Sequence, residues 1–143
     1  MDFKTVTYGS SEHQKALELR NQILRESLGL VMNYDEIKGE YKATHVVGYE
    51  NNEIICGLYL NYQYDGNWDL EQVFVLPEHQ KKGIGSTLLA FAEDYVSKHG
   101  GRAIQATTRV SAMGFYQKLG YTVKGEEFIK CTIPFVKMFK ELS

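Results

Sequence analysis

The feature that most constrains this fold is one amphipathic segment, beginning at Gly83, with strand-like segments on both sides of it. Its apolar residues recur at helical spacing and form one face: Ile84, Leu88, Leu89, Phe91, Ala92, Tyr95 and Val96. Gly100 and Gly101 then stop the helical pattern. A single crossover helix between two sets of strands predicts a mixed α/β sheet with helices packed on it.

Four segments before this helix have the composition of strands: 4–8, 44–50, 53–64 and 68–76. Turn signals separate the last three, because Asn51-Asn52 and Asp65-Gly66 favour tight hairpins. Pro77 ends the fourth segment. These segments predict an antiparallel meander.

A first helix is predicted between the first two strands. Ser11-x-x-Gln14 forms a possible capping box, and apolar residues follow at helical spacing through Leu28, for about four turns. Residues 35–41 are predicted to form a short, acidic helical piece.

The segments after Gly101 predict a strand over 102–107, a short helix over 111–119 that Gly120 ends, and two strands over 121–128 and 132–139. The whole chain, 1–143, is therefore expected to form one three-layer α/β domain. Its central mixed, mostly antiparallel sheet is expected to hold about six to seven strands, with helices on both faces.

Composition excludes several classes of protein. A net charge of -2 and a pI near 6.1 argue against a nucleic-acid-binding protein. No apolar run approaches the roughly 18 residues that span a bilayer, so we expect no membrane contact and a cytoplasmic location. Cys56 and Cys131 have no His or Cys at metal-ligand spacing, which predicts no metal site.

The loop between the fourth strand and the central helix reads Gln80-Lys81-Lys82-Gly83-Ile84-Gly85-Ser86. Its glycines let backbone N–H groups approach an anion, and the helix N-terminus adds partial positive charge. The Walker pattern is absent, and the dinucleotide fingerprint fails because Leu88 stands where its third glycine would be. Coenzyme A remains as the phosphorylated cofactor to consider.

Two ordered motifs resemble the GNAT superfamily of N-acetyltransferases. The first is Gln80-x-x-Gly83-x-Gly85 after a strand, similar to the family's Arg/Gln-x-x-Gly-x-Gly/Ala signature. The second is residues 115–121, Phe-Tyr-Gln-Lys-Leu-Gly-Tyr, similar to the family's later Phe-Tyr-x-Lys-x-Gly-Phe segment. The resemblance covers essentially the whole chain in element order, although before residue 70 only the pattern matches.

This resemblance implies acetyl-CoA as cosubstrate and a splayed sheet, with the pantetheine arm between the strands 69–76 and 103–107. It also implies a set of cofactor-binding positions: Val73, Phe74, Val75, Gln80, Lys81, Lys82, Gly83, Ile84, Gly85, Ser86, Arg109 and Tyr116. Arg109 departs from the asparagine of many members, and a narrower subgroup has arginine there. Phe135 stands where that subgroup has histidine.

Acetyl transfer to an amine requires removal of a proton, since an alkyl ammonium with a pKa of roughly 10.4 is almost fully charged at pH 7. Glu71 and Asp69 are candidate bases on one face of the fourth strand, with Glu71 preferred because it lies nearer the expected acetyl site. Tyr116 is the candidate acid for the departing thiolate, the role that the resemblance implies. The absence of a convincing nucleophile, with Cys131 the one rival, favours direct transfer in a ternary complex.

The acceptor is expected over residues 24–41 and 128–135, where acidic residues could favour a cationic primary amine and tyrosines could form an aromatic wall. These are Glu26, Asp35, Glu36, Glu40, Tyr34, Tyr62 and Tyr64. The four histidines, His13, His45, His79 and His99, are read as surface or strand residues. A homodimer is compatible with the pattern, and the alternative function is a CoA-binding module with weak or no catalysis.

Overall fold

The computed structural model describes residues 1–24, 38–130 and 132–142, and it contains one seven-stranded sheet. Neighbouring strands follow the order β1-β2-β3-β4-β5-β7-β6. The pair β4 and β5 is parallel, whereas β1–β2, β2–β3, β5–β7 and β6–β7 are antiparallel. The predicted mixed, mostly antiparallel sheet is confirmed. The strands are β1 (Asp2–Val6), β2 (Thr44–Glu50), β3 (Glu53–Tyr64), β4 (Asn67–Val75), β5 (Ala103–Arg109), β6 (Thr122–Lys130) and β7 (Ile133–Glu141).

Three α-helices are described: α1 (Ser11–Leu24), α3 (Ile84–Lys98) and α4 (Met113–Lys118). Two short 3₁₀ helices, η2 (Pro77–His79) and η3 (Val110–Ala112), precede α3 and α4 respectively. Among these described helices, none is long and apolar enough to cross a membrane.

The chain forms two compact units, and each is built from separate stretches of sequence. The first comprises Met1–Asn61 and Gln72–Ala92, and the second comprises Tyr62–Glu71 and Glu93–Ser143. Strands β3 and β4 and helix α3 therefore contribute residues to both units.

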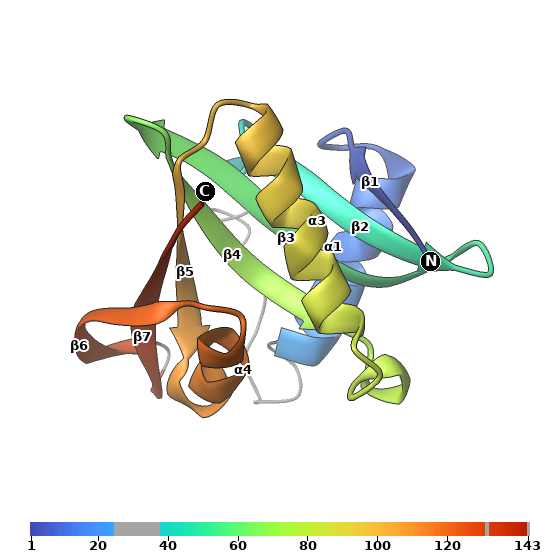
Figure 1. The fold of residues 1–143 in the computed structure, drawn as a ribbon. Coiled ribbons are helices and arrows are strands. Elements are labelled where there is room, and N and C mark those ends of the chain that lie inside the picture. Colours follow the sequence, from blue (N-terminus) through green and yellow to red (C-terminus); the bar gives the residue numbers. More distant parts are fainter. Residues whose placement is uncertain (25–37, 131, 143) are drawn as a thin grey trace. The chain divides into compact units, whose positions relative to one another are not determined.

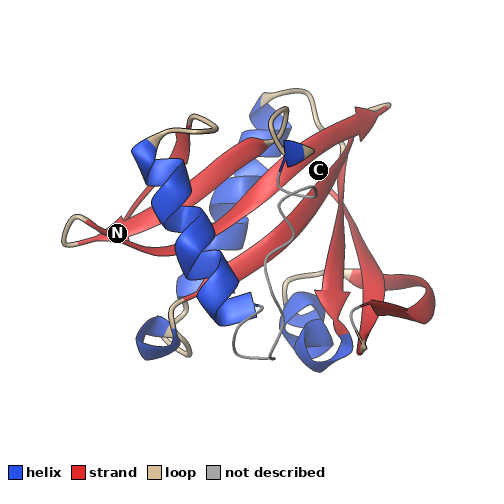
Figure 2. Ribbon diagram, turned by 180° about the vertical axis from the view of Figure 1, so that it is seen from behind, coloured by secondary structure: helices blue, strands red, loops and turns tan. Residues whose placement is uncertain are grey.

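In the first unit, helices cover both faces of the strands. Figure 1 shows the beginning of α3 over one face of β2 and β3, and Figure 2 shows α1 over the other. On the α1 face, Leu19 packs in a core cluster with Val47, Ile54 and Phe74. On the α3 face, the rings of Phe3 and Phe91 stack with centroids 5.5 Å apart. The prediction of helices on both faces is confirmed.

In the second unit, β7 pairs along β5 from Ala103↔Glu141 to Arg109↔Phe135, and β6 pairs with β7 at the edge of the sheet. The end of α3 is tied to these strands by Glu93. Its carboxylate accepts hydrogen bonds from the hydroxyl of Tyr121 at 3.0 Å and from Lys140 Nζ at 2.9 Å. The three strands predicted along the chain after Gly101 are confirmed.

The two hairpin turns also follow the prediction. Asn51 and Asn52 have φ values of 52° and 65°, and Asp65 and Gly66 have values of 51° and 77°. A two-residue hairpin turn of type I′ requires positive φ at both central residues, which explains why Asn, Asp and Gly occupy these positions.

The predicted capping box at Ser11 is wrong by one residue. The hydroxyl of Ser10 accepts a hydrogen bond from the N–H of His13 at 3.1 Å, so Ser10 caps α1. A turn in which Ser10 N–H donates to the carbonyl of Thr7 brings the chain round before Ser11, and the helix begins there. The predicted extension through Leu28 lies outside the described residues, as does most of the helical piece at 35–41.

The predicted short helix at 111–119 is divided in two. Residues Val110–Ala112 form the 3₁₀ turn η3, and α4 begins only at Met113. The strand β5 runs to Arg109, two residues further than predicted, because its pairing with β7 continues to Phe135.

Candidate functional site

The predicted anion-binding loop joins β4 to α3 in the first unit. The chain leaves β4 through η2, and α3 begins at Ile84. Gly83 has a φ of 80°, and a Cβ placed there would meet nothing within 4 Å. The first described hydrogen bond of the helix joins Thr87 N–H to the carbonyl of Gly83 at 3.1 Å. The N–H groups of the preceding residues lack partners within the helix and can serve an anion.

The charge around this loop also suits an anion. Lys81 and Lys82 are exposed, and the first turn of α3 contains no acidic residue. The backbone at Lys81 has a φ of 64°, a left-handed conformation that a non-glycine residue adopts at some cost. The loop is therefore a turn with an unobstructed glycine and two exposed lysines. A pyrophosphate fits this donor set.

Gln80 has a different role from a direct phosphate contact in this structure. Its side-chain Nε2 donates a hydrogen bond of 2.9 Å to the backbone carbonyl of Val75 at the end of β4. The signature glutamine thus connects the two ends of the loop. We infer that it holds the turn in shape.

Residues 73–75 of β4 present backbone and side chains differently. Phe74 is buried with 4% exposure in the core cluster, so only its backbone can meet a ligand. Val73 and Val75 are half-buried on the alternate positions. Gln72, just before them, has a φ of 58°, which marks a local distortion of the strand.

In the second unit, β4 pairs with β5 over only four residues, from Asn67↔Ala103 to Leu70↔Ala106. The two carboxylates expected to act as base lie at and just beyond the end of this ladder. Gln63 Nε2 donates to Asp69 Oδ2 at 2.8 Å. Burial, followed by the neighbouring charge of Glu71, raises the pKa of Asp69. The charge of Glu71 therefore acts on the Asp69 carboxyl group.

Tyr116 lies on α4 and is buried with 5% exposure. Its ring meets those of Phe115 and Tyr121 edge-on, at 5.1 and 5.6 Å between centroids. Burial raises the pKa of its phenol well above the ordinary value, partly offset by a side-chain hydrogen bond with Thr108. The phenol is therefore protonated at neutral pH.

Arg109, which replaces the asparagine of many family members, and Phe135, which stands where the narrower subgroup has histidine, are partners in the β5–β7 ladder. Burial lowers the pKa of the Arg109 guanidinium. The ring of Phe135 stacks on that of Phe128 at 6.1 Å. These two positions thus come together at one end of β5, a relationship that their 26-residue separation in sequence does not reveal.

Two histidines form a buried cluster that the sequence reading missed. His13 on α1 is 3% exposed, and its ring meets that of His45 on β2 with centroids 4.4 Å apart. The expectation that His13 lies on the surface or on a strand is wrong, whereas His45 is a strand residue as predicted. A signal existed, because His13, Ala16, Leu17 and Arg20 have the i, i+3, i+4, i+7 spacing of one helix face.

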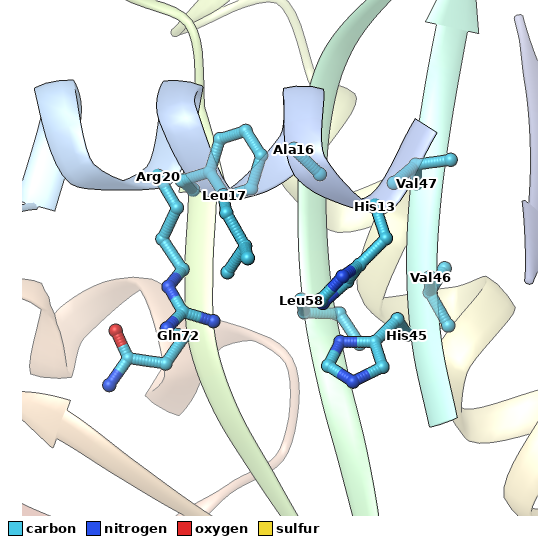
Figure 3. Close-up of a pocket in the computed structure, with 10 residues that line it drawn as sticks. His13, Ala16, Leu17, Arg20, His45, Val46, Val47, Leu58 and Gln72 are labelled. Atoms are coloured by element: carbon cyan, nitrogen blue, oxygen red, sulfur yellow. The ribbon is translucent and has the colours of Figure 1, made fainter. Parts of the chain in front are cut away.

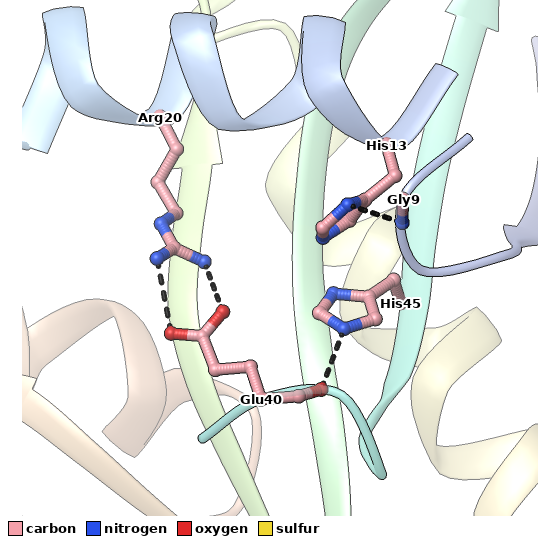
Figure 4. Close-up of polar contacts among 5 residues, drawn as sticks. All are labelled: Gly9, His13, Arg20, Glu40 and His45. Atoms are coloured by element: carbon pink, nitrogen blue, oxygen red, sulfur yellow. Dashed lines mark hydrogen bonds and ion pairs between the residues drawn. The ribbon is translucent and has the colours of Figure 1, made fainter. Parts of the chain in front are cut away.

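Glu40 is unavailable to attract a cationic acceptor, contrary to the expectation. Its carboxylate is paired with Arg20 at 2.9 and 3.0 Å, and the residue is 6% exposed (Figure 4). Tyr62 and Tyr64 are exposed on β3 in the second unit. Glu26, Tyr34, Asp35 and Glu36 lie outside the described residues.

Cys56 is fully buried, and burial raises the pKa of its thiol to about 12, so a thiolate nucleophile is not available there. Cys131 lies outside the described residues. No group of three or more metal-ligating side chains occurs within residues 1–24, 38–130 and 132–142.

These features define an α/β protein whose mixed sheet carries a basic, glycine-containing loop at the start of a crossover helix. The family model for the acetyltransferase (GNAT) domain matches residues 11–142. The chain belongs to the GNAT family of acetyltransferases, and the predicted family is confirmed.

Individual relatives agree with this assignment. The uncharacterized N-acetyltransferase YjcF of Bacillus subtilis (strain 168) is 30% identical over 108 residues, which cover 75% of each protein. A Lactobacillus plantarum crystal structure, provisionally assigned as an N-acetyltransferase, superposes with a TM-score of 0.88 at 23% identity over the whole of both chains. An aminoglycoside 6'-N-acetyltransferase in complex with coenzyme A has a TM-score of 0.80 at 18% identity, covering 99% of this chain and 97% of that one.

Proposed function

We propose that this protein transfers the acetyl group of acetyl-CoA to a primary amine, directly and within a ternary complex. The observation that carries the proposal is the loop 80–86, which precedes the unpaired N–H groups at the start of α3. It contains residues with positive φ, a glycine with no atom near its Cβ position, and two exposed lysines. Membership of the GNAT family supplies the cosubstrate, and a CoA-bound relative with the same fold supports it.

In this proposal the loop backbone and Lys81, Lys82 and Ser86 hold the pyrophosphate, while the backbone of Val73 and Val75 orients the arm that carries the acetyl group. When bound, acetyl-CoA supplies an activated acyl group and a thiolate leaving group. Gln80 acts by fixing the turn through its bond to Val75. These residues bind and orient the cofactor, and other residues carry out the proton transfers.

Proton removal from the ammonium is assigned to Glu71, with Asp69 as the alternative. The two carboxylates concentrate negative charge at the end of the β4–β5 ladder, which favours an approaching cation. Tyr116 donates the proton that the departing thiolate sulfur takes up, since its phenol stays protonated at neutral pH. Arg109 is proposed to contact the cofactor, as in the subgroup that the chain resembles.

Direct transfer is favoured over an acetyl-enzyme because Cys56 is buried and its thiol pKa is about 12. Acid quenching of the enzyme with radiolabelled acetyl-CoA, before an amine is added, is expected to leave no protein-bound label. Label that remained on Cys131 and passed to an amine would overturn the direct route.

The test of the function is thiol release from acetyl-CoA across a panel of primary amines, with a thermal-shift titration of CoA alongside. We expect CoA to raise the unfolding temperature and at least one amine to stimulate thiol release. Stabilisation by CoA without turnover on any amine would instead identify a CoA-binding module. The absence of both effects would contradict the loop assignment itself.

A further inference from the structure

A small pocket in the first unit lies between α1 and strands β2, β3 and β4 (Figure 3). Much of its wall is apolar, and its polar side chains are those of His13, Arg20, His45 and Gln72. The space open to the centre of a water molecule is about 20 Å³. A buried water needs roughly 10–15 Å³ by this measure, so the pocket has room for one small group.

His13 presents a hydrogen-bond donor to this pocket. The backbone N–H of Gly9 donates to Nδ1 of His13 at 3.0 Å (Figure 4). Because a backbone N–H can only donate, Nδ1 carries a lone pair, and the proton of the neutral ring is on Nε2. This Nε2–H is buried and has no hydrogen-bond partner among the described residues. A buried donor is almost always paired, so its partner is a group that the described residues do not supply.

His45 presents an acceptor beside it. Its Nε2 lies 3.0 Å from the backbone carbonyl oxygen of Glu40, and a carbonyl oxygen can only accept. Nε2 therefore carries the proton, and Nδ1 carries the lone pair. Figure 4 shows Nδ1 of His45 on the side of the ring that faces His13. One donor and one acceptor therefore border the same small space.

We propose that this pocket is a binding site for a single hydroxyl group, which accepts from Nε2–H of His13 and donates to Nδ1 of His45. An ammonium group has no lone pair with which to accept from Nε2–H of His13. A carboxylate cannot donate to His45, and Arg20 is already neutralised by Glu40. Water and the hydroxyl of an alcohol satisfy both nitrogens.

The site does not depend on the proposed acetyl transfer. It lies next to Gln72, the distorted residue of β4 that precedes the positions assigned to the acetyl group. A hydroxyl here comes either from solvent or from an organic molecule, and the two sources share the same hydrogen-bond chemistry. The experiments below separate them.

The first experiment is a crystal structure at a resolution that shows ordered water, combined with ¹⁵N NMR of the histidine side chains. We expect a water within hydrogen-bond distance of both nitrogens and a His13 ring protonated on Nε2. An empty pocket, or a His13 ring protonated on Nδ1, would overturn the proposal.

Two substitutions at His13 provide a matched pair. In His13→Asn the amide oxygen takes the place of Nδ1 and still accepts from Gly9, but no donor reaches the pocket. In His13→Gln the amide N–H₂ lies near the position of Nε2. We expect the water to be lost in the first variant and retained in the second, with the exposed His99→Asn as control. Retention of the same water in His13→Asn would exclude His13 as its anchor.

Two probes of similar size, methanol and methylammonium, test whether the bound hydroxyl comes from solvent or from an organic molecule. Methanol is expected to replace the water and shift the His13 and His45 side-chain resonances if organic hydroxyls enter, and water that persists in methanol identifies solvent as the source. Either result agrees with a hydroxyl site. Preferential binding of methylammonium at these nitrogens would contradict it.

Discussion

Arg20 and Glu40 face each other through two parallel hydrogen bonds, from Nη1 to Oε1 at 2.9 Å and from Nη2 to Oε2 at 3.0 Å. Their side chains are only 10% and 7% exposed. The carbonyl of Glu40 also accepts the hydrogen bond from His45. Glu40 is thus held through both its side chain and its backbone, which connects the chain before β2 to helix α1.

Breaking this pair should be costly. Arg20→Leu leaves the Glu40 carboxylate buried without its partner, and we expect a loss of about 3–5 kcal/mol in the free energy of unfolding. The control is Lys98→Ala, which removes an exposed pair with Asp94 at 2.8 Å and should cost at most about 0.5 kcal/mol. Urea unfolding measures both. Equally small losses of stability in the two variants would show that the buried pair contributes no more than the exposed pair.

The His13 imidazole should make the protein sensitive to mild acid. Burial, followed by the charges of His45 and Arg20, lowers the His13 pKa to about 4 from an ordinary value of 6.5. As the pH falls below 6.5, the His13 ring of the unfolded state takes up a proton, whereas the ring in the folded state stays neutral until about pH 4. Stability is therefore lost as the pH falls through this window, by about 2 kcal/mol at about pH 5 and about 3 kcal/mol in full.

Unfolding free energies at about pH 7 and about pH 5 measure this loss. His45, whose pKa burial also lowers, acts in the same direction. His13→Asn should show a smaller loss on acidification than the parent protein, whereas the exposed His99→Asn should match the parent. A loss unchanged in His13→Asn would assign the effect to other groups.

Glycine at position 83 should matter for its backbone conformation. In Gly83→Ala the added Cβ meets no atom, but a φ of 80° strains an L-residue by about 1–2 kcal/mol. We expect lower stability and weaker CoA binding, measured by thermal shift and calorimetric titration. Gly114→Ala in α4 is the control, since its Cβ also meets no atom and no positive φ is required there. That variant should be neutral or slightly stabilised, by up to about 1 kcal/mol.

Tyr116→Phe should separate acid catalysis from packing. The ring stays, and the hydrogen bond to Thr108 is lost, at a cost of about 1 kcal/mol in stability. If the phenol protonates the departing thiolate, turnover falls by roughly 10²- to 10⁴-fold. Tyr121→Phe is the matched control, because that phenol is also buried and donates to Glu93 at 3.0 Å. Equal losses of turnover in the two variants would mean that Tyr116 acts through packing alone.

The base should be visible in the pH dependence of kcat/KM. We expect Glu71→Gln to lower kcat/KM and to abolish its fall on the acid side, since the protonatable carboxylate is gone. Asp69→Asn should keep that fall, because the Asp69 carboxylate accepts a hydrogen bond from Gln63 and is not the preferred base. The opposite result would exchange the two roles.

Much of the fold was predictable from local patterns. Strands β2 and β3 have the predicted bounds, because the turn at Asn51-Asn52 leaves no freedom in where the strands end. Helix α3 begins one residue after Gly83, where the apolar periodicity begins. Local signals failed where two similar residues compete, as at Ser10 and Ser11, since the turn from Thr7 decides which hydroxyl reaches the helix N-terminus.

The sequence by itself determined the element order, the sheet class, the family and the loop 80–86, because these depend on neighbouring residues and their spacing. Only the tertiary structure decided the contacts between distant positions: His13 with His45, Arg20 with Glu40, and Arg109 opposite Phe135. The sequence pattern of a polar residue on a helix is the same whether its side chain faces solvent or a buried partner. Its burial, its tautomer and its pKa are set by side chains that the chain brings to it only on folding.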